Sequence, residues 1–278
     1  MPNHRNIAAP INVHGIGRSG TTLLQNILGA TGEVQVCNET AGLVFCCYRG
    51  AEVSSGSDDR DVSAFSADIR VAAVRAALCA VLPSDKPCWC QKLGGLPNYI
   101  RWDMVASDDR AYAAEPYAFP YRWFWDVLRT TFPDSKDVLI LRDYRDVIVS
   151  RHHYSGWRPE EIAADVAVYL NLMAHDASKI DCVIRYEDLV ARPEKVVHRL
   201  MSALGLTGGQ SAVQALAWHG SPSPEEDLAA ARNRGFSWRA EYASVLPDGI
   251  TRLVTPAVRR LEERFGIELS ASWKAVRL

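Results

Sequence analysis

The opening of the chain, a short apolar run that leads straight into a glycine-rich turn, constrains the fold more than any other feature. Residues 11–14 (INVH) are typical of a short buried strand, and apolar residues return in helical period at 23–28. Between them, residues 15–22 read GIGRSGTT, a turn rich in small residues. A strand that passes through a glycine loop into a helix opens a βαβ unit, so the sequence predicts an α/β fold.

The same alternation of strand and helix continues along the chain. Buried strands are also predicted at 34–36, 88–91, 137–141 and 182–185. Helices are predicted at about 40–48, 64–81, 160–177, 193–204, 209–218 and 254–265, and another begins near Tyr144. This order predicts a parallel sheet flanked by helices on both faces. No repeat or linker divides the chain, and we expect a single domain over residues 1–278.

Composition and charge narrow the classes of partner. The 278 residues are 48% hydrophobic and 23% charged, with a formal net charge of −2. This balance lacks the basic field of a nucleic-acid binder and argues against a polyanionic polysaccharide as a ligand. No apolar run is long enough for a membrane span or a signal peptide. We therefore expect a cytoplasmic protein that binds no nucleic acid, and the sequence makes no prediction of its oligomeric state.

The cysteines point to neither a disulfide scaffold nor a metal site. Seven of them, without regular spacing, stand at positions 37, 46, 47, 79, 88, 90 and 182. Cys88 and Cys90 form a C-x-C pair, but no nearby histidine completes a zinc site. No acidic cluster suggests Mg²⁺ either. We therefore predict that the thiols are reduced and buried and that the protein holds no metal.

The turn at 15–22 is similar to the phosphate loop G-x-x-x-x-G-K-[ST], whose backbone N–H groups hold nucleotide phosphates at a helix N-terminus. Gly15 and Gly20 match the two glycines, and Thr22 stands at the hydroxyl position. Thr21 replaces the lysine, and a cation is found instead at Arg18, inside the loop. The pattern predicts an anion cradle that lacks the lysine needed to reach a γ-phosphate.

The R-S-G-T-T run in this turn resembles the 5'-phosphosulfate loop of the sulfotransferase superfamily. That family uses 3'-phosphoadenosine 5'-phosphosulfate (PAPS) as donor, on a single P-loop-NTPase-like domain. The resemblance implies that the 5' end of the donor is held by Gly17, Arg18, Ser19, Gly20, Thr21 and Thr22. The motifs are most similar to those of tyrosylprotein sulfotransferases and related bacterial enzymes. Tyrosylprotein sulfotransferases are membrane-anchored and lumenal, so their protein substrate is not carried over to this chain.

Three later motifs extend the resemblance in family order. Arg142 ends the strand DVLIL and Ser150 follows eight residues later, as in the family's 3'-phosphate motif, where the planar fork of an arginine suits a phosphate. Tyr186 opens Y-E-D-L, where the family's tyrosine lies along the adenine. Arg234 and Gly235 resemble a shortened form of the late loop that closes over the 3'-phosphate.

The predicted chemistry depends on residues at two other strand ends. Sulfuryl transfer resembles phosphoryl transfer, in which positioning and charge stabilisation dominate. Glu39, in C-N-E-T, resembles the general base of the tyrosylprotein branch, and Lys92 resembles its catalytic lysine. Arg18 is the second predicted catalytic cation. His14 is interpreted as a packing or hydrogen-bonding residue, and no metal is required.

No motif identifies the acceptor. Aromatic residues crowd an irregular stretch at 98–125, and with residues 41–62 they are expected to form the wall and lid for a small molecule that carries a hydroxyl or an amine. Two alternatives stay open. A P-loop nucleotide kinase is disfavoured by Thr21 and by Arg142, which stands where a magnesium-holding aspartate is expected. A non-catalytic protein that binds adenosine 3',5'-bisphosphate (PAP), the product of PAPS, is disfavoured by Glu39 and Lys92.

Overall fold

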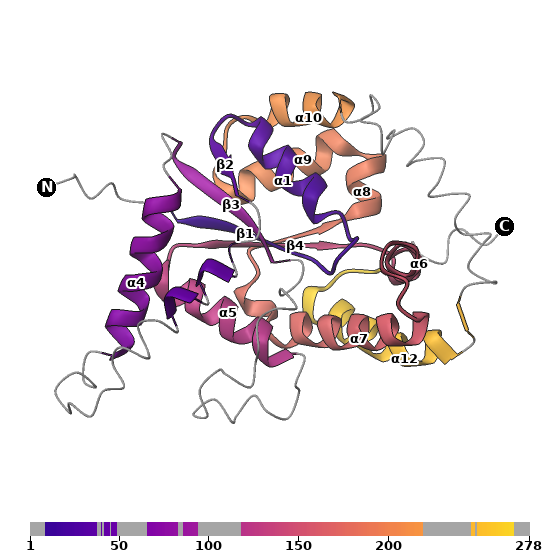
Figure 1. Ribbon diagram of the computed structural model, residues 1–278. Helices are drawn as coiled ribbons and strands as arrows, with labels where there is room; N and C mark the ends of the chain where they lie inside the picture. Colours follow the sequence, from indigo (N-terminus) through magenta and orange to yellow (C-terminus); the bar gives the residue numbers. More distant parts are fainter. Residues whose placement is uncertain are drawn as a thin grey trace, which may run out of the picture.

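Five strands form one parallel sheet at the centre of the molecule (Figure 1). The computed structural model describes residues 9–37, 40, 42–44, 46–48, 66–82, 86–93, 118–218, 246–247 and 249–269. The strands are β1 (Pro10–His14), β2 (Val34–Val36), β3 (Cys88–Leu93), β4 (Lys136–Leu141) and β5 (Cys182–Arg185). Their order is β2-β3-β1-β4-β5. Strand β1 is therefore central, with β3 and β2 on one side of it and β4 and β5 on the other. The predicted α/β fold with a parallel sheet is confirmed.

Helices cover both faces of this sheet, as predicted. Figure 1 shows α1 (Thr21–Ala30), α8 (Tyr186–Ala191), α9 (Pro193–Leu204) and α10 (Gly209–Trp218) above it. On the other side lie α4 (Ser66–Val81), α5 (Ala118–Thr131), α7 (Pro159–His175) and α12 (Gly249–Phe265). The short η3 (Ala177–Lys179) follows α7 in the sequence. Helix α6 (Tyr144–Ser155) follows the carboxyl end of β4. None of the described helices is both long and apolar enough to cross a bilayer.

Strand β4 shows why these residues form a sheet with two cores. Val138 and Ile140 pack into the core under α1 and α9, whereas Leu139 and Leu141 pack into the core under α5 and α7. A strand buried on both faces reads as a continuous apolar run, because successive side chains point to opposite sides. The DVLIL run was for this reason the clearest strand in the sequence.

The largest differences from the predicted boundaries are at α5 and α12. The stretch 98–125 was expected to be irregular, but helix α5 begins at Ala118 and buries Phe124 and Trp125 in the core. These two aromatic side chains fill space in the core under the sheet. Helix α12 begins at Gly249, five residues before the predicted start, and runs through Pro256.

The cysteines are free, as predicted, although not all are buried. Cys37, Cys90 and Cys182 are buried, and Cys46 and Cys79 are exposed. Burial raises the pKa of Cys90 to about 12. A thiol with so high a pKa is protonated near neutral pH, so Cys90 is a packing residue rather than a nucleophile.

Candidate functional site

The glycine loop lies at the carboxyl end of the central strand β1, where ligands bind in open parallel sheets (Figure 1). The N–H of Ser19 closes the turn by donating to the carbonyl of Ile16 at 2.9 Å. A Cβ atom on Gly15 would lie 2.4 Å from Ser19 Oγ, and one on Gly20 would lie 2.7 Å from Tyr186 Cδ2. Gly20 also has a φ of 102°, a region that favours glycine. Both glycines are therefore required by the shape of the loop.

Arg18 joins the loop to the predicted 3'-phosphate motif. Its φ of 75° makes it the one non-glycine residue with positive φ in the described part of the chain. Arg18 Nε donates to Ser150 Oγ at 3.1 Å, and its carbonyl accepts from Arg142 Nη1 at 3.1 Å. Its guanidinium also lies 5.1 Å from the centre of the Tyr154 ring. Backbone strain of this kind is concentrated at binding sites, where surrounding contacts hold it.

Tyr186 and Asp146 complete the surroundings of Arg142. The guanidinium carbon of Arg142 lies 4.5 Å from the centre of the Tyr186 ring, and its Nε lies 3.6 Å from Asp146 Oδ2. The ring of Tyr186 in turn covers Gly20. The structure thus brings together five predicted residues, Arg18, Gly20, Arg142, Ser150 and Tyr186. They lie in the segments that follow three neighbouring strands, β1, β4 and β5.

Two acids hold the helices that carry this cluster. Asp143 caps α6 by accepting from the N–H of Arg145 at 2.9 Å. The N–H of Asp143 donates to Glu187 Oε1 at 2.8 Å, which ties the start of α8 to the start of α6. Burial raises the pKa of Glu187, although the hydrogen bond from Asp143 opposes the rise.

Lys92 stands next to the loop, on the side of β3. Its Nζ lies 3.4 Å from Thr22 Oγ1 in the first turn of α1. The side chains of Ser19 and Thr21 are buried, and Ser19 Oγ has no hydrogen-bond partner among the described residues. Glu39, Arg234 and Gly235 lie outside the described residues, so their roles stay predictions, as do those of most of 41–62 and of 98–117.

A model of the sulfotransferase family matches residues 10–208, well over half of the chain. The chain belongs to the sulfotransferase family. The matched range contains the glycine loop, Lys92, Arg142, Ser150 and Tyr186. Membership supports sulfuryl transfer as the class of activity. None of the curated proteins matches the chain.

Three of the solved structures similar to the chain are sulfotransferases at low identity. The sulfotransferase domain from the Synechococcus PCC 7002 olefin synthase has a TM-score of 0.51 and 17% identity, over 96% of this chain and 98% of that chain. The sulfotransferase domain from the curacin biosynthetic pathway has a TM-score of 0.48 and 17% identity, over 75% and 78%. The sulfotransferase from Alicyclobacillus acidocaldarius has a TM-score of 0.46 and 16% identity, over 95% of this chain and 99% of that chain. The first likeness supports the P-loop-like fold and nothing finer.

One feature of this sulfotransferase was missed in the sequence, a buried polar network on the α5 face of the sheet. His14 is fully buried, and its Nε2 lies 2.7 Å from Asp137 Oδ1. The same oxygen accepts from Asn12 Nδ2 at 3.0 Å and from Trp125 Nε1 at 2.9 Å. The interpretation of His14 as a hydrogen-bonding residue is confirmed. Polar residues inside two otherwise apolar strands, Asn12 in β1 and Gln91 in β3, were the available signal.

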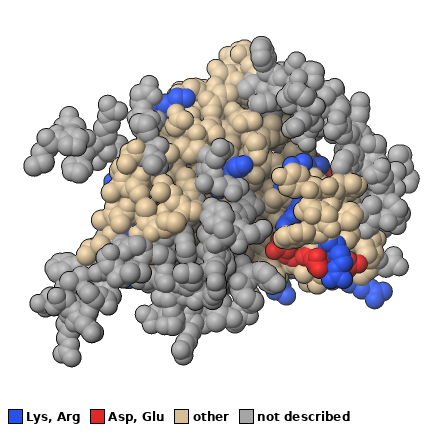
Figure 2. Space-filling view, in the orientation of Figure 1, with Lys and Arg blue, Asp and Glu red and all other residues tan. Residues whose placement is uncertain are grey.

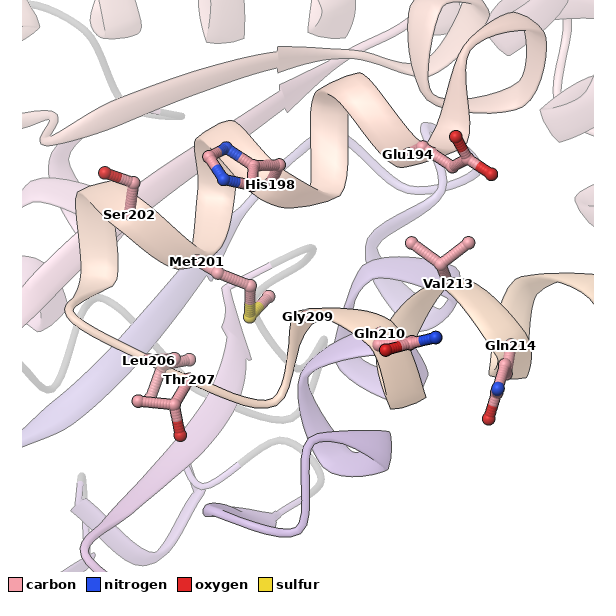
Figure 3. Close-up of a pocket in the computed structure, with 10 residues that line it drawn as sticks. All are labelled: Glu194, His198, Met201, Ser202, Leu206, Thr207, Gly209, Gln210, Val213 and Gln214. Carbon is pink, nitrogen blue, oxygen red and sulfur yellow. The ribbon is translucent and has the colours of Figure 1, made fainter.

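A separate cavity of about 700 Å³ lies between α9 and α10 of the sulfotransferase fold. Figure 3 shows Met201 of α9 and Val213 of α10 pointing into the gap between the two helices, with Glu194 of α9 across from Val213. None of the residues that line it is a predicted site residue, so it is distinct from the cluster around Arg18.

Charge at the α6 end of the molecule is mixed. Figure 2 shows Lys and Arg side chains on the right of the view, with Asp and Glu beside them. Part of the mixture is explained by local ion pairs such as Arg151 with Asp165, at 2.7 Å, and Arg158 with Glu161, also at 2.7 Å. In the described part of the chain, no three His, Cys, Asp or Glu side chains are grouped to hold a metal ion.

Proposed function

We propose that the protein transfers the sulfuryl group of PAPS to a hydroxyl or amine of a small-molecule acceptor. One observation carries the proposal: Arg18 contacts both Arg142 and Ser150, at 3.1 Å each. These contacts unite a loop at the end of β1 with a motif more than 120 positions away in the sequence. A donor with a phosphate on each side of one ribose needs two such anion sites close together.

The residues at this edge suit the two ends of PAPS. Gly15 and Gly20 let the loop pack closely against neighbouring side chains, where a Cβ would clash. The backbone N–H groups of this loop, at the N-terminus of α1, would bind the 5'-phosphate. Because Ser19 and Thr21 are buried, we expect them to act mainly through their backbone. At the other end, Arg142 and Ser150 would bind the 3'-phosphate and Tyr186 the adenine. Arg234 and Gly235 are proposed from the sequence to close over the 3'-phosphate.

Three residues are proposed for the chemistry. The acceptor oxygen or nitrogen bonds to sulfur while the bond from sulfur to the bridging oxygen breaks, and PAP leaves with that electron pair. Glu39 takes the acceptor proton in this step. Lys92 and Arg18 stabilise the negative charge that develops on the bridging oxygen and on the sulfuryl oxygens. The contact of Lys92 with Thr22, at 3.4 Å, supports its place beside the 5' end.

The remaining parts of the proposal concern the acceptor and the setting. Residues 41–62 and the part of 98–125 that precedes α5 are proposed to form the acceptor wall and lid. We propose one sulfotransferase domain over residues 1–278, acting in the cytoplasm without a metal.

Calorimetry without magnesium tests the donor. We expect PAP to bind far more tightly than 5'-AMP or ATP, because only PAP fills both anion sites. Binding of ATP in preference to PAP, above all if it requires magnesium, would establish the kinase alternative.

Turnover of PAPS with a panel of phenols, alcohols and amines then tests catalysis, with Glu39→Gln as the companion variant. We expect this variant to bind PAP normally and to lose transfer by about 100-fold or more. Wild-type protein that binds PAP without any turnover would support the non-catalytic alternative.

A further inference from the structure

We propose that a buried chain of hydrogen bonds from Asp137 through Asn12 and Gln91 to Thr40 positions the segment that carries the predicted base. Gln91 and Thr40 are, in this proposal, positioning residues for Glu39. The inference rests on the proposed function, because it takes Glu39 as the base. It is carried by contacts among described residues on both sides of that segment.

Asp137 is the fixed end of this series of hydrogen bonds. Its side chain is fully buried, and Oδ1 accepts from Asn12, His14 and Trp125 at 2.7–3.0 Å. Oδ2 accepts from Arg129. Burial alone would raise the pKa of Asp137, but the hydrogen bonds from His14 and Asn12 and the charge of Arg129 outweigh it, and the pKa lies below its usual range. The carboxylate is therefore ionised and can only accept hydrogen bonds.

This acceptor sets the direction of every bond that follows. Since Asp137 cannot donate, the Asn12 side chain must present its NH₂ group to it, which leaves Asn12 Oδ1 to accept from Gln91 Nε2 at 2.8 Å. Gln91 Oε1 is then left to accept from the hydroxyl of Thr40. Asn12 and Gln91 are both fully buried. Hydrogen bonds whose donors all point the same way polarise one another. The series ends at Thr40, which directly follows Glu39 in the sequence.

The two described neighbours of residues 38 and 39 are both held firmly. On one side, the N–H of Cys37 donates to the carbonyl of Cys90 at 2.8 Å, and its carbonyl accepts from Gln25 Nε2 at 2.6 Å. On the other side, Thr40 bonds to Gln91, and its carbonyl accepts from the N–H of Val44 at 3.0 Å. Only two residues separate these anchors. The anchors therefore fix where the chain enters and leaves the segment of the predicted base.

Packing alone does not call for Gln91. Its strand neighbours on the same face, Trp89 and Leu93, are buried apolar residues. An apolar side chain would fill the position without the need to satisfy a buried amide. Gln91 also directly precedes Lys92, the predicted catalytic cation. Through Gln91, the end of β3 thus connects the segment that carries Glu39 with Lys92. A purely structural role for Gln91 would not require this connection.

Thr40→Val and Thr40→Ser form the test pair, because valine removes the hydroxyl at nearly constant shape and serine keeps it. Hydrogen exchange of the peptide over 37–48 is measured first. We expect faster exchange in Thr40→Val and wild-type exchange in Thr40→Ser. Turnover of PAPS with the best acceptor of the panel is measured next. We expect kcat of Thr40→Val to fall about 10- to 100-fold, with KM for PAPS and the affinity for PAP unchanged, and serine to restore it.

Thr131→Val is the matched control. Thr131 is also buried, and its hydroxyl donates to the carbonyl of Val127 at 2.7 Å in α5, outside the network. This variant loses one hydroxyl bond and should keep wild-type exchange over 37–48 and wild-type kcat. Unchanged exchange in Thr40→Val, or faster exchange with wild-type kcat, overturns the positioning role. A wild-type protein that binds no PAP overturns the proposed function instead, and the exchange measurement still decides whether Thr40 is an anchor.

Discussion

The glycine loop and the proposed 3'-phosphate motif, Arg142 to Ser150, meet at one edge of the sheet, but they hold their shapes in different ways. The loop is shaped by its backbone: Gly15 and Gly20 have no room for a side chain, and Arg18 has a positive φ. The 3'-phosphate motif is shaped by side chains: Arg142 lies against Tyr186 and near Asp146. Arg18 joins the two regions, because its guanidinium donates to Ser150 and its backbone carbonyl accepts from Arg142.

The difference determines how each region should respond to change. The loop has no space for a side chain at Gly15 or Gly20. A methyl group added at either position should therefore shift the loop backbone and weaken the contacts that the backbone makes. A motif built from charged side chains can lose one group and keep its overall shape, so the effect should be confined to the ligand group that this side chain binds. Substitutions in the two regions can therefore test whether the division holds.

Gly20→Ala should have the largest effect. The new Cβ would lie 2.7 Å from Tyr186, and alanine would have to adopt a φ near 102°, so both the fold and the loop are strained. We expect the free energy of unfolding to fall by about 1–3 kcal/mol and PAP binding to weaken by roughly 30-fold or more. Thermal unfolding and calorimetry measure the two effects.

Gly32→Ala is the control for this variant. Gly32 has a φ of 78° but no atom within 4 Å of its Cβ position, so it shares the backbone strain without the clash. It should lose some stability and bind PAP like the wild type. Equal losses of PAP binding in both variants would show that a general loss of stability, and not the closeness of Tyr186 to residue 20, weakens PAP binding.

Arg142→Ala should have a smaller and more selective effect. Removing one charge-assisted contact to the 3'-phosphate should weaken PAP by about 1.5–3 kcal/mol. The affinity for 5'-AMP, which lacks that phosphate, should change little. Calorimetry with both nucleotides gives the comparison, and Arg158→Ala, at an exposed ion pair with Glu161, is the neutral control. An equal loss for both nucleotides would place Arg142 at the 5' end or in the fold.

The sequence revealed the parts of this protein whose pattern is local. The glycine loop and the DVLIL strand are continuous motifs, and the structure places them as predicted. The start of α12 was missed because the helix runs through Pro256, a residue that usually marks a boundary. The buried network was missed because Asn12 and Asp137 are 125 positions apart, and their pairing depends on the register of β1 with β4. Strand pairing across such a distance leaves no mark in the local pattern.

Glu187→Gln should have the smallest effect, and it tests whether the side-chain-built region alone responds to pH. Burial raises the pKa of Glu187 above its ordinary value of 4.5. Since the folded-state pKa exceeds the unfolded one, the stability that the protonated group contributes is complete below about pH 4.5 and is lost as the pH rises through the raised pKa. Glutamine keeps an acceptor for the N–H of Asp143 and carries no charge. The variant should therefore match the wild type at low pH and become more stable than it as the pH rises.

Urea unfolding between pH 4.5 and 8 measures this difference. The comparison variant is Glu161→Gln, because the hydrogen bond from Arg158 lowers the pKa of the exposed Glu161. Its contribution has the opposite sign: it is present above the unfolded pKa and is lost as the pH falls. Glu161→Gln should thus be slightly less stable than the wild type at neutral pH and should match it in acid. If Glu187→Gln showed the same direction as Glu161→Gln, the ionised carboxylate of Glu187 would be favoured in the folded protein. The hydrogen bond from the N–H of Asp143 would then outweigh the cost of burying the charge.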